Sequence, residues 1–447
     1  MIFIILVFIA LFLFNNYLFT NIMTFGDNLD VQTLIFAFLL LFGLTIWQII
    51  ISKKIYIRKS FITLIFFFSY FLFKIFIDIG DLGKLESYTI GSSGGYLLFY
   101  SIALLINISF DKINTLTATS NRCFVLFFLL SGIYILSGAY FMYKSYIELS
   151  GYLKNNIFLI SLVENNYQRP GKFLVMSTLL VSYISTNNLL NTSKKSFLFK
   201  IMLFVYTCVL LAILLSSMLL AQMSGSNNAL ICNGCLLIIN LVFYIFLLSP
   251  KVKYLLQKEI IGIKNFFLSG RILNKFLISA LIGLMVSSGI LIFVINIYGI
   301  DIDQLRITGY GSHEVSSINS RVALFANFST QISFSPITPF VGNMQVDSLT
   351  TGEGTYVHSF FVSIFTHLGI VGIILIFRFL FFAIKELFDR SSGIYKNGMK
   401  IYKIILFLGF LLIATAATFF TWTPLWFLFG LFFLPINFVM YSKERFN

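Results

Sequence analysis

Apolar stretches of about twenty residues recur along this chain, separated by shorter polar segments. A stretch of this length crosses a ~30 Å hydrocarbon core as a helix. There are about twelve, near residues 1–20, 31–51, 60–78, 92–110, 123–143, 172–190, 201–222, 229–249, 277–298, 357–382, 404–421 and 425–441. The pattern predicts an all-α, polytopic membrane protein. The first stretch lacks a basic start and a small-residue cleavage site, so we expect it to be a retained span.

One long polar interruption, residues 299–356, breaks this pattern. Its backbone groups would go unpaired in hydrocarbon, so we expect it to form a large loop on one face of the membrane. The loop separates a region of about nine spans (1–298) from a region of about three (357–447). Within the loop, residues 317–334 place apolar side chains near one stripe and are followed by prolines, which predicts a helix lying along the membrane surface.

The distribution of charge orients the spans. The 447 residues are 58% hydrophobic and only 11% charged, with a formal net charge of +14. With the N-terminus in the cytoplasm and the spans alternating, 22 of the 31 Lys and Arg residues fall in cytoplasmic loops. This bias follows the positive-inside rule and predicts cytoplasmic N- and C-termini. Because the basic charge is explained by topology, we expect the bilayer, and no nucleic acid, as its partner.

Several ionisable residues near the predicted spans are interpreted as structural. Lys74 and Arg378 lie toward the ends of their spans and can snorkel to the interface, so they do not indicate a transport path. We expect Asp78 to be solvated, like the other acids of the external loops. His367 is expected to be buried and to serve helix packing. The Asp-x-Asp at Asp301 is interpreted as solvated acids, and no metal or cofactor is expected.

Four local patterns follow one another in the second half of the chain. They are Arg169-Pro170-Gly171-Lys172-Phe173; Ser224-Gly225-Ser226-Asn227-Asn228-Ala229; Ser320-Arg321-Val322-Ala323-Leu324-Phe325 with Ser335-Pro336-Ile337 and Gly342-Asn343; and His358-Ser359-Phe360-Phe361 with Thr366-His367-Leu368-Gly369-Ile370-Val371-Gly372. The predicted topology puts the first three in external segments and the fourth at the opening of the next span.

This ordered set resembles the bacterial O-antigen polymerase and O-antigen ligase superfamily, over roughly residues 165–380. Members show Arg-x-x-Gly-x-Phe before a middle span, a Thr-Gly-Ser-Arg turn, an Arg-led helix running toward Pro and a Gly pair, and His-Asn opening a span with Glu-x-Gly-x-x-Gly. This chain departs from the pattern at three positions: Asn227 replaces the Arg of the turn, Ser359 the Asn, and His367 the acid. These departures favour the more variable polymerases.

The resemblance implies a GT-C-like, multispan inner-membrane glycosyltransferase with a large periplasmic loop. Its substrate would be an undecaprenyl-diphosphate-linked oligosaccharide, and a chain-length regulator protein is an expected partner. The reaction would join lipid-linked repeat units with inversion and without a metal, as a step of lipopolysaccharide biosynthesis.

The chemistry of such a transfer selects candidate residues. Charge develops on the diphosphate leaving group, and Arg stabilises it best through bidentate hydrogen bonds, so Arg169 and Arg321 are the predicted diphosphate ligands. His358, where the loop re-enters the membrane, is the candidate base for the acceptor hydroxyl. Asp347 and Glu353 are candidates for binding sugar hydroxyls or for acting as the base instead.

Two other functions remain open from the sequence. One is an O-antigen ligase, which would transfer the finished polysaccharide to lipid A–core. The other, from a different class, is a lipid-linked oligosaccharide flippase or transporter. A transporter typically shows paired halves, interrupted spans or charges at the bilayer midplane, and the sequence shows little of this.

Overall fold

The structure is a computed structural model, and it describes twelve segments of the chain. These are residues 1–23, 31–51, 54–79, 94–150, 168–192, 197–224, 226–248, 337–344, 359–388, 394–417, 422–433 and 436–439. The expected surface helix at 317–334, the span at 277–298 and most of the large loop lie outside these segments.

The described elements are helices, with one pair of short strands. In chain order they are α1 (Ile2–Met23), α2 (Val31–Ile51), β1 (Lys54–Ile57), α3 (Lys59–Ile79), α5 (Gly94–Thr119), α6 (Asn121–Ser150), α7 (Gln168–Thr192), α8 (Phe197–Met223), α9 (Asn227–Leu248), α14 (Thr338–Val341), α16 (Phe360–Phe388), α17 (Ile394–Ala417), α18 (Thr423–Phe432) and β2 (Ile436–Val439).

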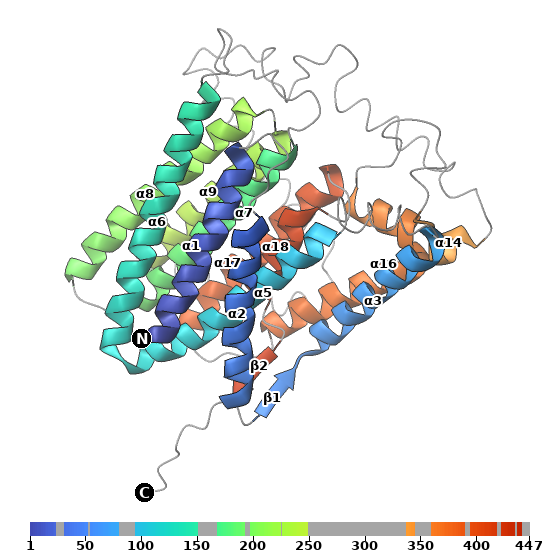
Figure 1. Ribbon diagram of the computed structural model, residues 1–447, viewed down its shortest axis with the longest axis horizontal. Coiled ribbons are helices and arrows are strands. Elements are labelled where there is room, and N and C mark those ends of the chain that lie inside the picture. The colour runs from blue at the N-terminus through green and yellow to red at the C-terminus, as the bar shows by residue number, and fades with distance from the viewer. Residues whose placement is uncertain are drawn as a thin grey trace, which may run out of the picture.

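The long helices form a bundle with a paired extension at one side (Figure 1). Helices α1, α6, α7, α8 and α9 pack together on the left of the view, and α3 with α16 forms the extension on the right. Helix α18 packs most extensively against α5 and also contacts α7. One buried apolar core runs through the assembly, and the indole of Trp426 in α18 lies inside it, with no exposed surface.

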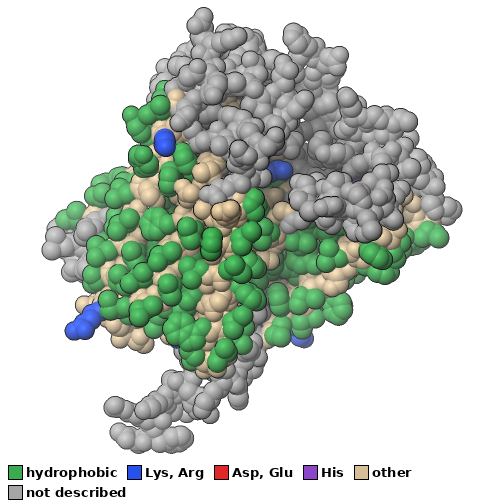
Figure 2. Space-filling view, in the orientation of Figure 1, with side chains coloured by type: hydrophobic (Ala, Val, Ile, Leu, Met, Phe, Trp, Pro, Cys, Tyr) green, Lys and Arg blue, Asp and Glu red, His purple; other side chains and the backbone are tan. Residues whose placement is uncertain are grey.

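The outer surface of the bundle is apolar, as a helix facing lipid requires. Figure 2 shows hydrophobic side chains over most of the described part of one face, with blue cations at only a few points. Among the described residues, eight helices are long and apolar enough to cross a membrane: α1, α2, α3, α5, α6, α8, α9 and α16. The chain therefore has the architecture of a multi-pass α-helical membrane protein.

Helix α7 occupies the predicted span at 172–190 but is not apolar. Almost all of its side chains from Pro170 to Leu189 are buried, and many of them are polar. They bond to neighbouring helices: the Thr178 hydroxyl donates to Asn233 Oδ1 of α9 at 2.7 Å, and Asn233 Nδ2 donates to Ser217 Oγ of α8 at 2.7 Å. Since protein surrounds α7 on all sides, its polar groups find partners that lipid would not supply.

The predicted final span at 425–441 is wrong. Helix α18 ends at Phe432 after ten residues, and Ile436–Val439 forms strand β2, which pairs antiparallel with β1. The physical reason is Pro435, which lacks the N–H that a continuing helix needs and restricts the residue before it. The apolar residues of α18 are buried against α5 and α7 rather than exposed to lipid.

The β1–β2 pair marks the end of the bundle that also holds the N-terminus (Figure 1). Tyr56 is opposite Asn437 in the register. Helix α1 starts at this end, because the Phe3 ring contacts Trp47 near the end of α2, with centroids 6.3 Å apart. The first residues and the described end of the chain thus lie on the same side of the bundle. The C-terminal end of α2 lies on this side, and the charge pattern predicts that the segment after α2 is cytoplasmic.

Candidate functional site

Most of the predicted site residues lie outside the described segments. Arg321, Asp347, Glu353 and His358 are all outside them, and so are Asp301 and its neighbours. Arg169 is the second residue of α7, and its side chain is not described. The site is therefore built from the parts of the four sequence patterns that the structure does describe.

The first and second patterns are in direct contact. Gly171, in the first turn of α7, faces the turn between α8 and α9, and a Cβ at this position would clash with the Ser226 side chain and lie 3.3 Å from Ala229 Cβ. The turn is tight: Ser226 N–H donates to the Ala221 carbonyl at 2.8 Å, and Ser226 is buried. The absence of a side chain at Gly171 allows the start of α7, which carries Arg169, to press against this turn.

The third and fourth patterns also meet. Residues 337–344 form a short helical turn, α14, that ends at Gly342 (φ 74°). This segment packs into an interruption of α16 at Gly369, whose φ of 64° and ψ of −164° are not helical. Asn343 N–H donates to the Thr366 carbonyl at 2.9 Å. Because the helix is interrupted at Gly369, this carbonyl can accept a hydrogen bond from outside the helix.

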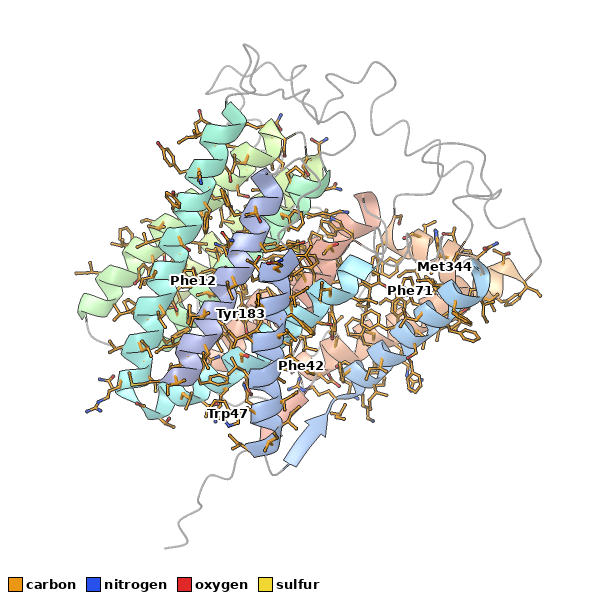
Figure 3. All side chains as sticks on the ribbon, viewed as in Figure 1. Phe12, Phe42, Trp47, Phe71, Tyr183 and Met344 are labelled. Carbon is orange, nitrogen blue, oxygen red and sulfur yellow. The ribbon has the colours of Figure 1, made fainter. Side chains whose placement is uncertain are left out.

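Helix α3 fastens the same segment from the other side through three side chains on one face. Tyr70 donates its hydroxyl hydrogen to the Val341 carbonyl at 2.8 Å, and Lys74 Nζ donates to the Gly342 carbonyl at 3.1 Å. Asp78 Oδ2 accepts the Met344 N–H at 2.9 Å. The three residues are spaced four apart, so they line one stripe of the helix. Figure 3 marks Met344 and Phe71 where the segment meets α3.

The expectations for Lys74 and Asp78 are therefore wrong. Lys74 does not snorkel: the residue is buried, and its ammonium nitrogen lies 2.8 Å from Asp78 Oδ2. Asp78 is not a solvated loop residue but belongs to the last turn of α3 and is itself largely buried. The partners that make burial of the two charges tolerable come from residues 342–344, far away in the sequence.

His367 is buried, as predicted. Its Nδ1 lies 2.9 Å from the Ser363 carbonyl and 2.9 Å from the Thr366 hydroxyl, both on its own helix. A carbonyl oxygen only accepts, so this contact requires a proton on Nδ1. The bond holds the ring against α16 beside the interruption. Ser359, which follows the candidate base His358, is buried at the start of the same helix.

The two contacting pairs of patterns lie at the same end of the bundle. Tyr183 donates to Asn107 at 3.1 Å and Asn114 donates to Asn187 at 3.2 Å, so α5 and α7 run in the same direction. The ring of Tyr96, near the start of α5, packs against Phe71 just past the middle of α3. The start of α7 and the end of α3 therefore share one end, opposite the β1–β2 pair (Figure 1).

The described part of the site offers few groups that could bind a substrate or a metal ion. In the described part of the site, Lys74 forms an ion pair with Asp78, so the Lys74 charge is already neutralised. We find no group of three or more His, Cys, Asp or Glu residues among the described residues that is arranged to hold a metal ion.

Sequence reasoning missed the residues that hold this site together. The spacing of Lys74 and Asp78 is typical of an ion pair on a helix, and this signal was available. No local sequence pattern predicts that residues 337–344 pack on α3 and α16. No family model matches the chain, and neither the curated proteins nor the solved structures contain a match to it.

Proposed function

We propose that this protein is a membrane glycosyltransferase of the O-antigen polymerase type. It would join undecaprenyl-diphosphate-linked oligosaccharide units at the periplasmic face of a bacterial inner membrane. The observation that supports the proposal best is the spatial order of the four sequence patterns. Among the described residues, the start of α7 in the first pattern packs on the turn of the second, and residues 342–343 of the third pack on residues 366–369 of the fourth. These contacts lie toward one end of the bundle (Figure 1).

In the proposed reaction, the non-reducing-end hydroxyl of one lipid-linked unit attacks the anomeric carbon of the lipid-linked growing chain. A new glycosidic C–O bond forms, and the bond from the anomeric carbon to the diphosphate oxygen breaks. Undecaprenyl diphosphate leaves with the bonding electron pair. The proton of the attacking hydroxyl passes to His358, or to Asp347 or Glu353 if one of these is the base.

Arg169 and Arg321 are assigned to the diphosphate. A guanidinium group placed in a cleft of low dielectric constant offers two parallel hydrogen bonds to phosphate oxygens, and these strengthen as the leaving group gains charge. Loss of one such preorganised donor typically slows a reaction about 10²–10³-fold. Lys74 and Asp78 serve a different purpose in this proposal: they fix the chain where the large loop returns to the membrane.

The test compares two arginines of the same loop, Arg321 and Arg306. Each is changed to Ala in a strain whose own gene is deleted, and the lipopolysaccharide is separated on a gel while protein level is followed by immunoblot. We expect Arg321→Ala to leave core carrying a single repeat unit, and Arg306→Ala to restore the long ladder. A normal ladder with Arg321→Ala would remove this residue from the mechanism.

The deletion strain itself distinguishes the alternative functions. A polymerase deletion leaves core plus one repeat unit. Bare core with lipid-linked polymer accumulating would instead identify an O-antigen ligase. Single lipid-linked units retained on the cytoplasmic side would identify a flippase. Either of these two outcomes would overturn the proposal.

A further inference from the structure

A cavity of about 290 Å³ opens between α3 and α16, toward the end of this helix pair opposite the docked segment. Two cationic side chains, Lys59 and Arg378, line it together with the apolar residues Ile62, Phe66 and Leu375. The two helices run antiparallel, because the start of α3 meets the end of α16, where Ser60 N–H donates to Glu386 at 3.1 Å. The cavity therefore lies toward the end of the bundle that carries the β1–β2 pair.

The two cations of the cavity have no anionic partner in the described part of the chain. Lys59 and Arg378 are both exposed, and no described carboxylate forms an ion pair with either. The Glu386 carboxylate, on the same helix as Arg378, instead accepts hydrogen bonds from the backbone N–H and the hydroxyl of Ser60. The opposite end of the same helix pair differs, since there Asp78 neutralises Lys74.

The depth of Arg378 makes an anion at this place favourable. Along α16, Arg378 precedes Glu386 by two helical turns, or about 12 Å, so its backbone lies inside the apolar zone of the helix pair. Its guanidinium carbon is 5.7 Å from the centre of the Phe382 ring, on the same helix. The Arg378 side chain must extend along the helix to bring its charge to the interface, and an anion that meets it there would stabilise it.

We propose that this cavity binds an anionic phospholipid from the surrounding leaflet. The lipid phosphate would lie between Arg378 and Lys59, and an acyl chain would follow the apolar wall formed by Ile62, Phe66 and Leu375. A zwitterionic lipid fits less well because its ammonium group would approach the same two cations. Basic pockets between membrane helices on the cytoplasmic side are suited to such head groups.

The charge distribution of the chain agrees with this occupant. The cavity is at the end that the positive-inside pattern predicts to be cytoplasmic, where anionic lipid concentrates. The proposal does not depend on the proposed glycosyltransferase activity. It requires only that the protein lies in a bilayer with α3 and α16 packed together.

The test measures lipid bound to the purified full-length protein. The protein is reconstituted in bilayers of equal phosphatidylglycerol and phosphatidylcholine, extracted in mild detergent, and analysed for retained lipid by native mass spectrometry. We expect preferential retention of phosphatidylglycerol, falling about fivefold for each of Lys59→Gln and Arg378→Gln. The matched control is Lys385→Gln, which removes an exposed cation of the same helix that does not line the cavity, and it should retain lipid as the unmodified protein does.

A second measurement separates lost binding from lost folding. Arg378→Lys keeps the charge and should keep most of the phosphatidylglycerol, while the unfolding temperature in detergent should rise with added phosphatidylglycerol but not with phosphatidylcholine or inorganic phosphate. Equal retention of the two lipids by the unmodified protein would overturn the proposal. So would an equal loss in the Lys385→Gln control. Stabilisation by inorganic phosphate alone would assign the site to a free anion instead.

Discussion

Gly342 and Gly369 meet backbone to backbone, although 27 positions separate them in the sequence. A Cβ on Gly369 would collide with the Phe340 carbonyl group and lie 2.5 Å from the Gly342 nitrogen. A Cβ on Gly342 would collide with the backbone of His367 and Leu368. This contact joins residues 337–344 to the interruption of α16, and both residues have positive φ angles that favour glycine.

Replacing Gly369 by Ala is predicted to separate these two segments. The backbone conformation at this position (φ 64°, ψ −164°) is almost restricted to glycine, and another residue there costs about 1–3 kcal/mol before any clash is counted. We expect Gly369→Ala to lower the thermal unfolding temperature in detergent. Under the proposed function, it should also shorten or abolish the polysaccharide ladder.

The control for this change is Gly43→Ala in α2. A Cβ at Gly43 meets no atom within 4 Å, and Ala favours a helix by about 1 kcal/mol over Gly. This variant should be at least as stable as the unmodified protein. If Gly369→Ala unfolds at the same temperature as Gly43→Ala, the close packing of the two segments is wrong.

The Lys74–Asp78 pair is predicted to behave as a coupled unit. Both side chains are largely buried, with exposed fractions of 8% and 13%, so removing one leaves the other charge uncompensated. We expect Lys74→Met alone or Asp78→Asn alone to destabilise the protein by about 3–5 kcal/mol. The double variant should cost less than the sum of the two single changes, because it leaves no isolated charge.

A double-mutant cycle measured by unfolding in detergent checks this prediction. Lys385→Met is the matched control, since Lys385 is an exposed cation on α16, and we expect it to change stability by less than about 0.5 kcal/mol. Additive effects of the two single changes would show that Lys74 and Asp78 do not interact.

Much of the fold could be predicted because lipid imposes a simple rule on a sequence. A helix that faces hydrocarbon needs a long apolar run, and eight such runs became helices of the required length. The rule fails where protein replaces lipid as the surroundings. Helix α7 is polar and buried, whereas α18 is apolar but too short to cross a membrane. The hydropathy of a segment alone does not show whether lipid or protein surrounds it.

The candidate site was less predictable for a different reason. The order of the four patterns predicts a shared site, and the described parts of the patterns contact one another in two pairs, Gly171 with Ser226 and Asn343 with Thr366. The partners of Lys74 and Asp78, however, are backbone groups that any residue could provide. A backbone carbonyl or N–H leaves no signal in the sequence, so the docking of residues 337–344 on α3 could not be foreseen.

The hydrogen bonds between α7, α8 and α9 are predicted to stabilise the centre of the bundle. Asn233 accepts from Thr178 and donates to Ser217, so Asn233→Leu removes both bonds, whereas Thr178→Val removes only one of them. Bonds of this kind between membrane helices contribute about 0.6–1.7 kcal/mol each. We expect Asn233→Leu to be the more destabilising change, as measured by unfolding in detergent. Equal stability of Asn233→Leu and the unmodified protein would show that the polar centre makes no net contribution.

The register of β1 and β2 can be tested by cross-linking. Residues directly opposite in an antiparallel pair have Cα atoms about 4.5–5.5 Å apart, which is within the range that a disulfide spans. Tyr56 is opposite Asn437, whereas Phe438 is opposite Ile55, and successive positions of a strand alternate between its two faces. In a Cys208→Ser background, which removes the exposed native thiol, we expect Tyr56→Cys/Asn437→Cys to oxidise to a disulfide. Tyr56→Cys/Phe438→Cys should oxidise much less.

Mass spectrometry of the tryptic peptides identifies the linked pair. Cross-linking of the second variant in preference to the first would shift the register by one residue, and its absence in both would refute the strand pair that ties the end of the chain to the segment between α2 and α3.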